Sequence, residues 1–222
     1  QTFVLKGAML FALWGGSLYR PTRDLDLTGY TQNDAGTLIP IVQGICAVPC
    51  PEDGLEFKIE TVRAEPIRDE GEYHGFRVKL VAMLEAARIN MQIDIGLGDA
   101  IQPPPNDVNY PVLLDAPSPH IRAYSREAVV AEKFHAMISL GERSTRFKDF
   151  YDVYALAKQF PFDGQQLAGA IAATFEQRRT PITPIQSTAV STASFSQDVR
   201  AAQWRTYLDR NGLPGAPADF AV

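Results

Sequence analysis

The stretch Arg23-Asp24-Leu25-Asp26-Leu27 alternates polar and apolar side chains, which is the pattern of a β-strand with one face toward a core. The two aspartates of such a strand project to one face, and the two leucines project to the other. Carboxylates two residues apart on a strand can share a hard cation such as Mg²⁺, whose ligands in proteins are carboxylate, phosphate and water oxygens. By itself the Asp-x-Asp pattern is a weak signal, because aspartates at strand ends also occur in turns and in solvent.

A second strand, predicted over residues 89–96, supplies a third carboxylate. Isoleucine and methionine occupy alternate positions of this segment and form an apolar face, while Asp94 lies on the polar face. Three acids on one face of neighbouring strands can hold two metal ions, which stabilise the attacking and leaving oxygens of a displacement. We therefore predict a Mg²⁺ site made of Asp24, Asp26 and Asp94.

The other apolar patterns of the chain predict a small sheet followed by helices. Helices are predicted over residues 3–14, 33–47, 125–140, 146–159, 164–178 and 197–211, further strands over 56–62 and 76–83, and loops over 98–119 and 180–196. This order predicts an α+β fold, in which a small mixed sheet with flanking helices precedes a helical half. The expected domains are residues 1–120, the catalytic core, and residues 121–222, a helical domain that contributes to the cleft.

The composition argues against a protein that binds nucleic acid over its whole surface, a zinc protein and a membrane-spanning protein. The 222 residues are 45% hydrophobic and carry a formal net charge of −5, which disfavours non-specific nucleic-acid binding over the whole surface but permits a local basic cleft. Neither the spacing nor the number of the cysteines, Cys46 and Cys50, fits a zinc site. No apolar run approaches the roughly 20 residues of a membrane span, and no signal peptide is evident, so we expect a cytoplasmic protein.

Lys133 is a second residue whose position in the sequence suggests a functional role. On an ideal helix it shares a face with Val129, Val130, Met137 and Leu140, and an ammonium group on an apolar face is costly unless it finds an anion. The side chain either extends to the edge of the core or reaches a phosphate in a cleft, and the sequence leaves both interpretations open.

The segment 146–152 carries alternating charges on a predicted helix. Ordinary helical spacing would pair Asp149 with Arg146 and Lys148 with Asp152. Its aromatic residues are more typical of a core than of a base-stacking surface. The sequence also lacks a Gly-x-Ser-x-Gly elbow or a phosphate-binding loop, so hydrolysis by a serine triad is unsupported.

Together these segments resemble a known family. Residues 4–27, with Lys6-Gly7 near their start and Thr22-Arg23-Asp24-Leu25-Asp26 at their end, are similar to the first motif of the AbiEii/AbiGii-toxin-type nucleotidyltransferases, members of the DNA polymerase β-like superfamily. Met91-Gln92-Ile93-Asp94-Ile95 resembles the strand of the third acid. Ala131-Glu132-Lys133 and the segment 144–152 resemble the later motifs. Ala8 and Met9 depart from the family's usual glycine and Thr/Ser, and the usual N-terminal helix before the motif is expected to be missing.

The resemblance implies roles for individual residues. Asp24 and Asp26 would hold metal, Thr22 would contact the triphosphate or the metal shell, and Lys133 would bind phosphate. Asp149 or Asp152 would help to organise the site. The motif residues Lys6, Gly7 and Lys148 would also contact the nucleotide.

The expected function is therefore transfer of a nucleotide from an NTP to an acceptor, with Mg²⁺ as cofactor and release of pyrophosphate. The resemblance implies a toxin-like component of a bacterial toxin–antitoxin or phage-defence system, with an RNA acceptor, tRNA first, or a protein acceptor such as the cognate antitoxin. The alternative is a non-catalytic module of the same fold that binds an NTP or a partner protein. If tRNA is the acceptor, Arg178, Arg179, Arg200, Arg205 and Arg210 are candidates for a docking patch, although scattered arginines are as often a solvated face.

Overall fold

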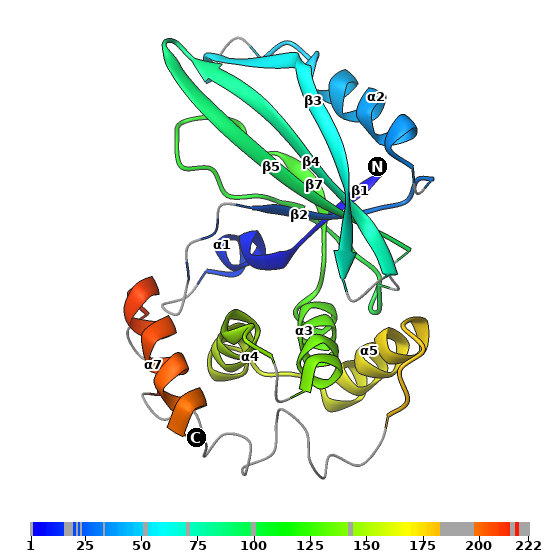
Figure 1. Ribbon diagram of the computed structural model, residues 1–222, viewed down its shortest axis with the longest axis vertical. Helices are drawn as coiled ribbons and strands as arrows, with labels where there is room; N and C mark the ends of the chain where they lie inside the picture. Colours follow the sequence, from blue (N-terminus) through cyan, green and yellow to red (C-terminus); the bar gives the residue numbers. More distant parts are fainter. Residues whose placement is uncertain are drawn as a thin grey trace. The chain divides into compact units, whose positions relative to one another are not determined.

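The computed structural model of the protein describes two compact units (Figure 1). The sheet unit comprises residues 1–9 and 22–99, and the helical unit comprises residues 10–21 and 100–222. The structure describes all residues except 1, 16–19, 21, 23, 33, 51–52, 70–71, 99–100, 142–143, 183–197, 214–215 and 218–222.

The described part of the sheet unit contains strands in the spatial order β3-β4-β5-β2-β1. These are β1 (Phe3–Lys6), β2 (Leu25–Gly29), β3 (Leu55–Asp69), β4 (Glu72–Leu84) and β5 (Ala87–Leu97). Strands β2 and β5 run parallel, whereas the other three neighbouring pairs are antiparallel. The mixed sheet and the combination of helices and strands confirm the predicted fold class.

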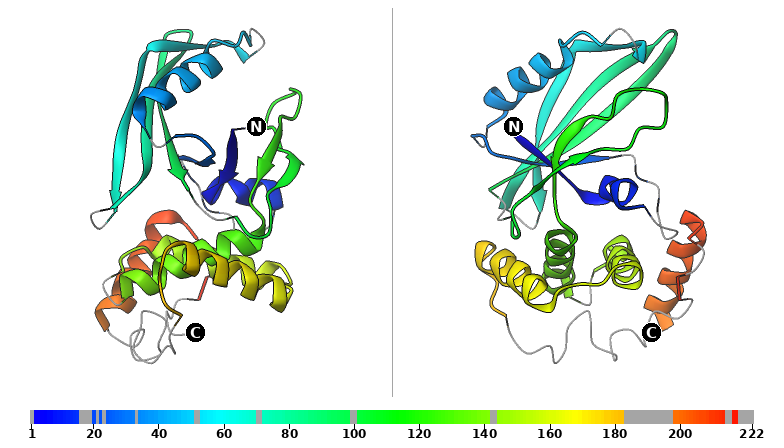
Figure 2. Two further views of the ribbon diagram at one scale, coloured as in Figure 1. Left: turned by 90° about the vertical axis from the view of Figure 1, so that its right-hand side faces the viewer. Right: turned by 180° about the vertical axis from the view of Figure 1, so that it is seen from behind.

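One face of this sheet is covered by helix α2 (Ala35–Cys46), which lies along the long strands in Figure 2. The helix begins at Asp34, whose side chain accepts a hydrogen bond from the Thr37 amide at 2.8 Å and so satisfies a free N–H of the first turn. Apolar side chains from α2 and from β3, β4 and β5 form the core beneath it: Leu38, Val42, Val62, Phe76, Val78, Leu80 and Ile95. The other face of the sheet carries the alternating polar side chains.

The helical unit begins with α1 (Leu10–Trp14) and includes an antiparallel pair of short strands, β6 (Asn106–Asn109) and β7 (His120–Ala123). Helix α3 (Arg126–Leu140) packs against both α4 (Phe147–Gln159) and α5 (Gly164–Gln177). Ser125 caps α3 as predicted, because its hydroxyl accepts a hydrogen bond from the Ala128 amide at 3.1 Å. Helix α7 (Asp198–Asn211) contributes Trp204 and Tyr207 to an aromatic group around Phe147.

Two predictions of secondary structure are wrong. The helix predicted over residues 3–14 is instead β1, a 3-10 turn η1 (Gly7–Met9) and the short α1. Val4 and Leu5 are buried in strand pairing with β2, and this tertiary pairing overrides an apolar run that also fits a helix. The loop predicted over residues 98–119 contains β6, whose asparagine-rich sequence gave no strand signal. Most of the predicted 180–196 connector lies outside the described residues.

Within the described part of the chain, every helix is too short or too polar to cross a bilayer.

Candidate active site

Two of the three predicted metal ligands lie side by side in the sheet unit. Asp26 on β2 and Asp94 on β5 are register partners on adjacent parallel strands, so their side chains project from the same face. This is the face opposite the core under α2. Asp24 precedes β2 by one residue, and its Oδ1 accepts a hydrogen bond from Gln92 Nε2 of β5 at 3.3 Å. The three carboxylates thus belong to one polar face, as the two alternating patterns predicted.

Asp94 is held by a residue that the sequence did not suggest. Arg77 is its register partner on β4, and the guanidinium donates from Nε to Oδ1 at 2.9 Å and from Nη2 to Oδ2 at 2.7 Å. Such two-pronged pairing fixes the orientation of both groups. Hydrogen bonding to Asp94 is the main cause of the raised pKa of Arg77, so the guanidinium stays charged.

The turn after β1 approaches Asp26 closely. Gly7 has φ +73°, and a Cβ atom built on it would lie 2.2 Å from Asp26 Oδ2. Only glycine permits both this backbone conformation and this approach. Lys6, the preceding residue, is the register partner of Asp26 on β1. Lys6 and Gly7, which the resemblance assigns to nucleotide contact, therefore border the acidic face.

Thr22 lies at the entrance to β2, where its Oγ1 is 3.5 Å from the carbonyl oxygen of Asp24. This long contact orients the hydroxyl toward the backbone that carries the first carboxylate. Its predicted role in the triphosphate or metal shell stays a prediction.

The donor chemistry of the acidic face fits Mg²⁺, since the available ligands are carboxylate oxygens. Its geometry fits only in part. Among the residues that the structure describes, no group of three or more His, Cys, Asp or Glu side chains is arranged to hold a metal ion. At Asp94 the Arg77 guanidinium takes one lone pair of each carboxylate oxygen and leaves the second available. That Asp24 and Asp26 hold the ion, with phosphate and water oxygens completing its shell, stays a prediction.

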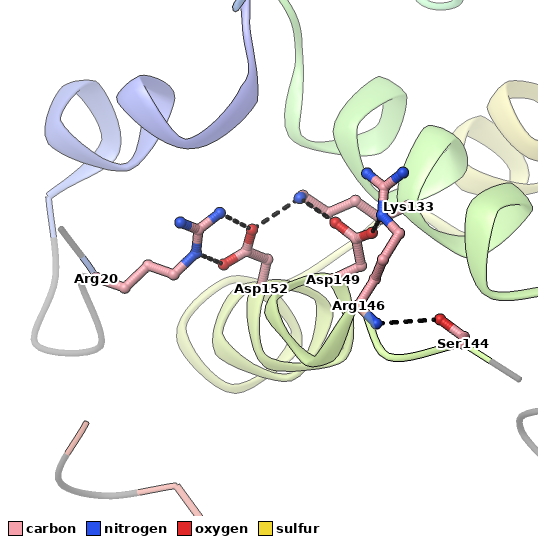
Figure 3. Close-up of polar contacts among 6 residues, drawn as sticks. All are labelled: Arg20, Lys133, Ser144, Arg146, Asp149 and Asp152. Atoms are coloured by element: carbon pink, nitrogen blue, oxygen red, sulfur yellow. Dashed lines mark hydrogen bonds and ion pairs between the residues drawn. The ribbon is translucent and has the colours of Figure 1, made fainter. Parts of the chain in front are cut away.

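A buried ionic network occupies the helical unit (Figure 3). Lys133 Nζ of α3 lies 2.9 Å from Asp149 Oδ1 and 2.7 Å from Asp152 Oδ2, both on α4. Arg20 donates to both oxygens of Asp152 at 2.7 and 2.9 Å, and Arg146 Nε donates to Asp149 Oδ2 at 2.8 Å. Every carboxylate oxygen of the two aspartates therefore has a cationic partner. This is how the structure accommodates charges at Asp149 and Asp152, which are 1% and 0% exposed.

The network keeps Lys133 and Asp149 ionised. Burial alone would lower the pKa of Lys133, but the charges of Asp152 and Asp149 raise it above its ordinary value. Burial would likewise raise the pKa of Asp149, but the nearby cations Lys133 and Arg146 hold it below its usual range. Lys133 thus finds the anion that its position on an apolar face requires, and that anion is a pair of aspartates on the neighbouring helix.

The segment 146–152 combines a correct prediction with an incorrect one. Arg146 and Asp149 pair as helical spacing predicts. The proposed Lys148–Asp152 pair does not form, because Asp152 faces Arg20 and Lys133, while Lys148 is exposed. Two of the five arginines predicted to form an RNA-docking patch are poorly placed for contact with RNA. Arg200 is buried, and Arg178 contacts Glu132 at 3.6 Å.

The residues that sequence reasoning missed are Arg77, Gln92 and Arg20. Alternation on the strands would have placed Arg77 and Gln92 on polar faces, but only the strand register brings them to Asp94 and Asp24. Arg20 precedes the Asp-x-Asp motif by a few residues, yet its partner Asp152 is 132 positions away along the chain.

Solved structures define the class of fold. A candidate nucleotidyltransferase from H. pylori superposes with a TM-score of 0.56 at 16% identity, covering 100% of this chain and 81% of the other. JHP933 from Helicobacter pylori gives a TM-score of 0.50 at 18% identity, covering 79% and 71%. At these identities the likeness concerns the fold alone, which is that of the nucleotidyltransferases.

The sequence defines the family within that class. The profile of the family described as "Nucleotidyl transferase AbiEii toxin, Type IV TA system" matches residues 1–221. The chain therefore belongs to the AbiEii nucleotidyltransferase toxin family. Among curated proteins, none matches it.

Proposed function

We propose that the protein is a Mg²⁺-dependent nucleotidyltransferase that moves a nucleotide from an NTP to a hydroxyl group of an RNA, with tRNA as the first candidate. The observation that carries the proposal is the register of Asp26 and Asp94 on parallel strands, with Asp24 on the same polar face, in a chain of this family. The family description also supports a role as the toxin of a two-component system with an antitoxin partner.

In this proposal Asp24 and Asp26 hold the metal and thereby position the triphosphate, while Lys6 and the Gly7 backbone border the phosphates. Bound Mg²⁺ supplies neutralisation of the phosphate charge. The acceptor hydroxyl attacks the α-phosphorus, a new P–O bond forms, and the bond to the bridging oxygen of pyrophosphate breaks. Asp94 accepts the proton of the hydroxyl, directly or through water. The roles of Lys133 and Lys148 as phosphate ligands, and of Asp149 and Asp152 as organising residues, stay predictions.

The test is incubation of the protein with each labelled NTP, Mg²⁺ and total tRNA. The informative variant is Asp26→Asn, which removes a charge but keeps the shape of the side chain. We expect it to lower transfer by about 100-fold or more, because carboxylate ligands position the metal and the phosphates. Asp115→Asn, which changes an exposed aspartate of the helical unit, is the matched control and should transfer at the wild-type rate.

The outcomes separate the candidate functions. Label on RNA that Asp26→Asn abolishes supports the proposal and identifies the nucleotide. Label on protein alone indicates modification of the toxin itself or of an antitoxin. Tight binding of Mg²⁺ and NTP without any product, with RNA and protein both supplied, would overturn transfer and favour the binding module.

A further inference from the structure

The polar face of the sheet unit extends well beyond the acidic site. Along β5 the side chains of Arg88, Asn90, Gln92 and Asp94 alternate with the apolar ones, so they share one face. Their register partners on β4 include Lys79, opposite Gln92, and Lys79 in turn faces Arg63 on β3. A strip of cationic and amide side chains therefore leads along the sheet to the carboxylates.

The surface of this strip contains a depression. This open depression of about 490 Å³ is lined by the polar residues Thr61, Lys79, Arg88, Asn90 and Gln92 and by the apolar residues Leu80, Val81 and Met91. Gln92 belongs to both features, because it lines the depression and donates to Asp24 at 3.3 Å. The depression and the acidic site are thus adjacent parts of one face.

The charges of the strip contrast with those of the whole chain, whose formal net charge is −5. Its cations are Lys58, Arg63, Lys79 and Arg88, and its acids outside the site are Glu56 and Glu65. Glu65 pairs with Lys79 at 2.8 Å, but both side chains are more than half exposed. Such a pair is weak and is screened by solvent, so Lys79 can exchange this partner for a phosphate with little change in free energy.

We propose that this strip binds the sugar–phosphate backbone of the single-stranded end of an RNA acceptor and leads that end to the acidic site. The inference rests on the proposed function, whose acceptor it specifies. Separate cations contact phosphates, and the amides of Asn90 and Gln92 donate to and accept from sugar or base edges. Arg88 and Asp94 are six residues apart on one strand, roughly 20 Å, which is room for several nucleotides.

A protein partner fits this face less well. The core of a protein interface is apolar and rich in aromatic side chains, with few charges. The exposed side chains of the strip are instead charged or amide-bearing: the cations Arg63, Lys79 and Arg88, Asn90, and the two acids Glu56 and Glu65. Because cations outnumber acids along the strip, its chemistry favours a polyanion.

The test measures binding of a labelled tRNA and of a short single-stranded RNA to the full chain by fluorescence anisotropy, at several salt concentrations. The variant is Lys79→Ala combined with Arg88→Ala. We expect roughly tenfold weaker binding, and a salt dependence whose slope falls by about 0.7 for each phosphate that the variant no longer neutralises. NTP binding should be unchanged, which shows that the sheet unit remains folded.

The control is Lys158→Ala, which removes a positive charge from an exposed position of α4 that belongs neither to the strip nor to the candidate arginine patch. This control should bind RNA as the wild type does. Equal binding and equal salt slope for Lys79→Ala/Arg88→Ala and wild type would overturn the inference, as would an equal loss of binding in the Lys158→Ala control. A wild-type protein that binds no RNA but labels a protein would also overturn it.

Transfer activity distinguishes this failure from failure of the proposed function. If the strip variant transfers to RNA with the wild-type KM while Asp26→Asn does not transfer, the function stands and the strip is not the acceptor surface. If RNA binding depends on the strip but no NTP is transferred to it, the surface stands and the proposed reaction is wrong.

Discussion

Arg77 and Asp94 form a two-pronged ion pair across β4 and β5, at 2.9 and 2.7 Å. The pair occupies both oxygens of a carboxylate that the sequence assigned to a metal. Arg77 and a metal ion therefore compete for Asp94, and removal of Arg77 should change the affinity of the site for the metal.

We expect Arg77→Gln to tighten binding of Mn²⁺, a spectroscopic substitute for Mg²⁺, because it frees the Asp94 carboxylate. The gain should be roughly two- to fivefold, since the ion pair is partly exposed and such pairs are weak. Paramagnetic resonance of free Mn²⁺ measures the affinity. In the double variant Arg77→Gln/Asp94→Asn the gain should disappear, and a gain that persists there would show that Arg77 acts through another group.

Lys133 provides a prediction about stability. Its removal leaves Asp149 and Asp152 buried with one cationic partner fewer, and breaking a buried ion pair in this way costs about 3–5 kcal/mol. Lys133→Met should therefore lower the free energy of unfolding by that amount in urea titrations. Lys148→Met, an exposed position on α4, should change it by less than about 0.5 kcal/mol. Equal effects of the two substitutions would contradict the structural role of Lys133.

Local patterns in the sequence were sufficient for much of the fold. Alternation placed β2 and β5 and assigned Asp24, Asp26 and Asp94 to polar faces, because side-chain direction on a strand depends only on position along it. Ser125 marked the start of α3 because a cap is a contact between near neighbours. The same local reasoning failed at Phe3–Lys6, where an apolar run fits either element and only the pairing with β2 decides between them.

The contacts that give the site its electrostatics could not be predicted in this way, because they depend on a turn that the sequence does not mark and on the packing of neighbouring helices. The antiparallel register of β4 and β5 places Arg77 opposite Asp94, and the two-residue turn that sets this register, Glu85-Ala86, has no glycine or asparagine to mark it in the sequence. Lys133 is the clearest example of a contact that the sequence alone did not predict. Its place on an apolar face required an anion, but the sequence suggested a phosphate or solvent, whereas the fold supplies Asp149 and Asp152 from the next helix.

The network also predicts how stability depends on pH. The pKa of Asp149 is lower in the folded state than its ordinary value of about 3.9, so its stabilisation is complete above that value and is lost as pH falls through the folded-state pKa. The pKa of Lys133 is raised, so its contribution is complete below about 10.4 and is lost only as pH rises through the folded-state value.

Asp149→Asn should therefore destabilise the protein most between about pH 5 and pH 9, and the difference from wild type should shrink as the pH falls below about 4. Urea unfolding of both proteins at about pH 7, 5 and 3, on either side of the ordinary carboxyl pKa, measures the difference. A difference that stays constant across this range would mean that the charge of Asp149 is not what stabilises the fold.

The close approach of Gly7 to Asp26 gives a test of the acidic site that leaves every charge in place. Gly7→Ala places a methyl group in a left-handed conformation and 2.2 Å from Asp26 Oδ2, so the carboxylate or the turn must move. Gly98→Ala is the matched control, because Gly98 has φ +81° but nothing within 4 Å of its added Cβ. Both variants should lose about 1–2 kcal/mol of stability from the backbone conformation, measured by urea unfolding. Only Gly7→Ala should also weaken Mn²⁺ binding, by about tenfold or more, since a small misplacement of a ligand has a large effect. Equal Mn²⁺ affinities in the two variants would show that Asp26 does not hold the metal at the place where Gly7 packs against it.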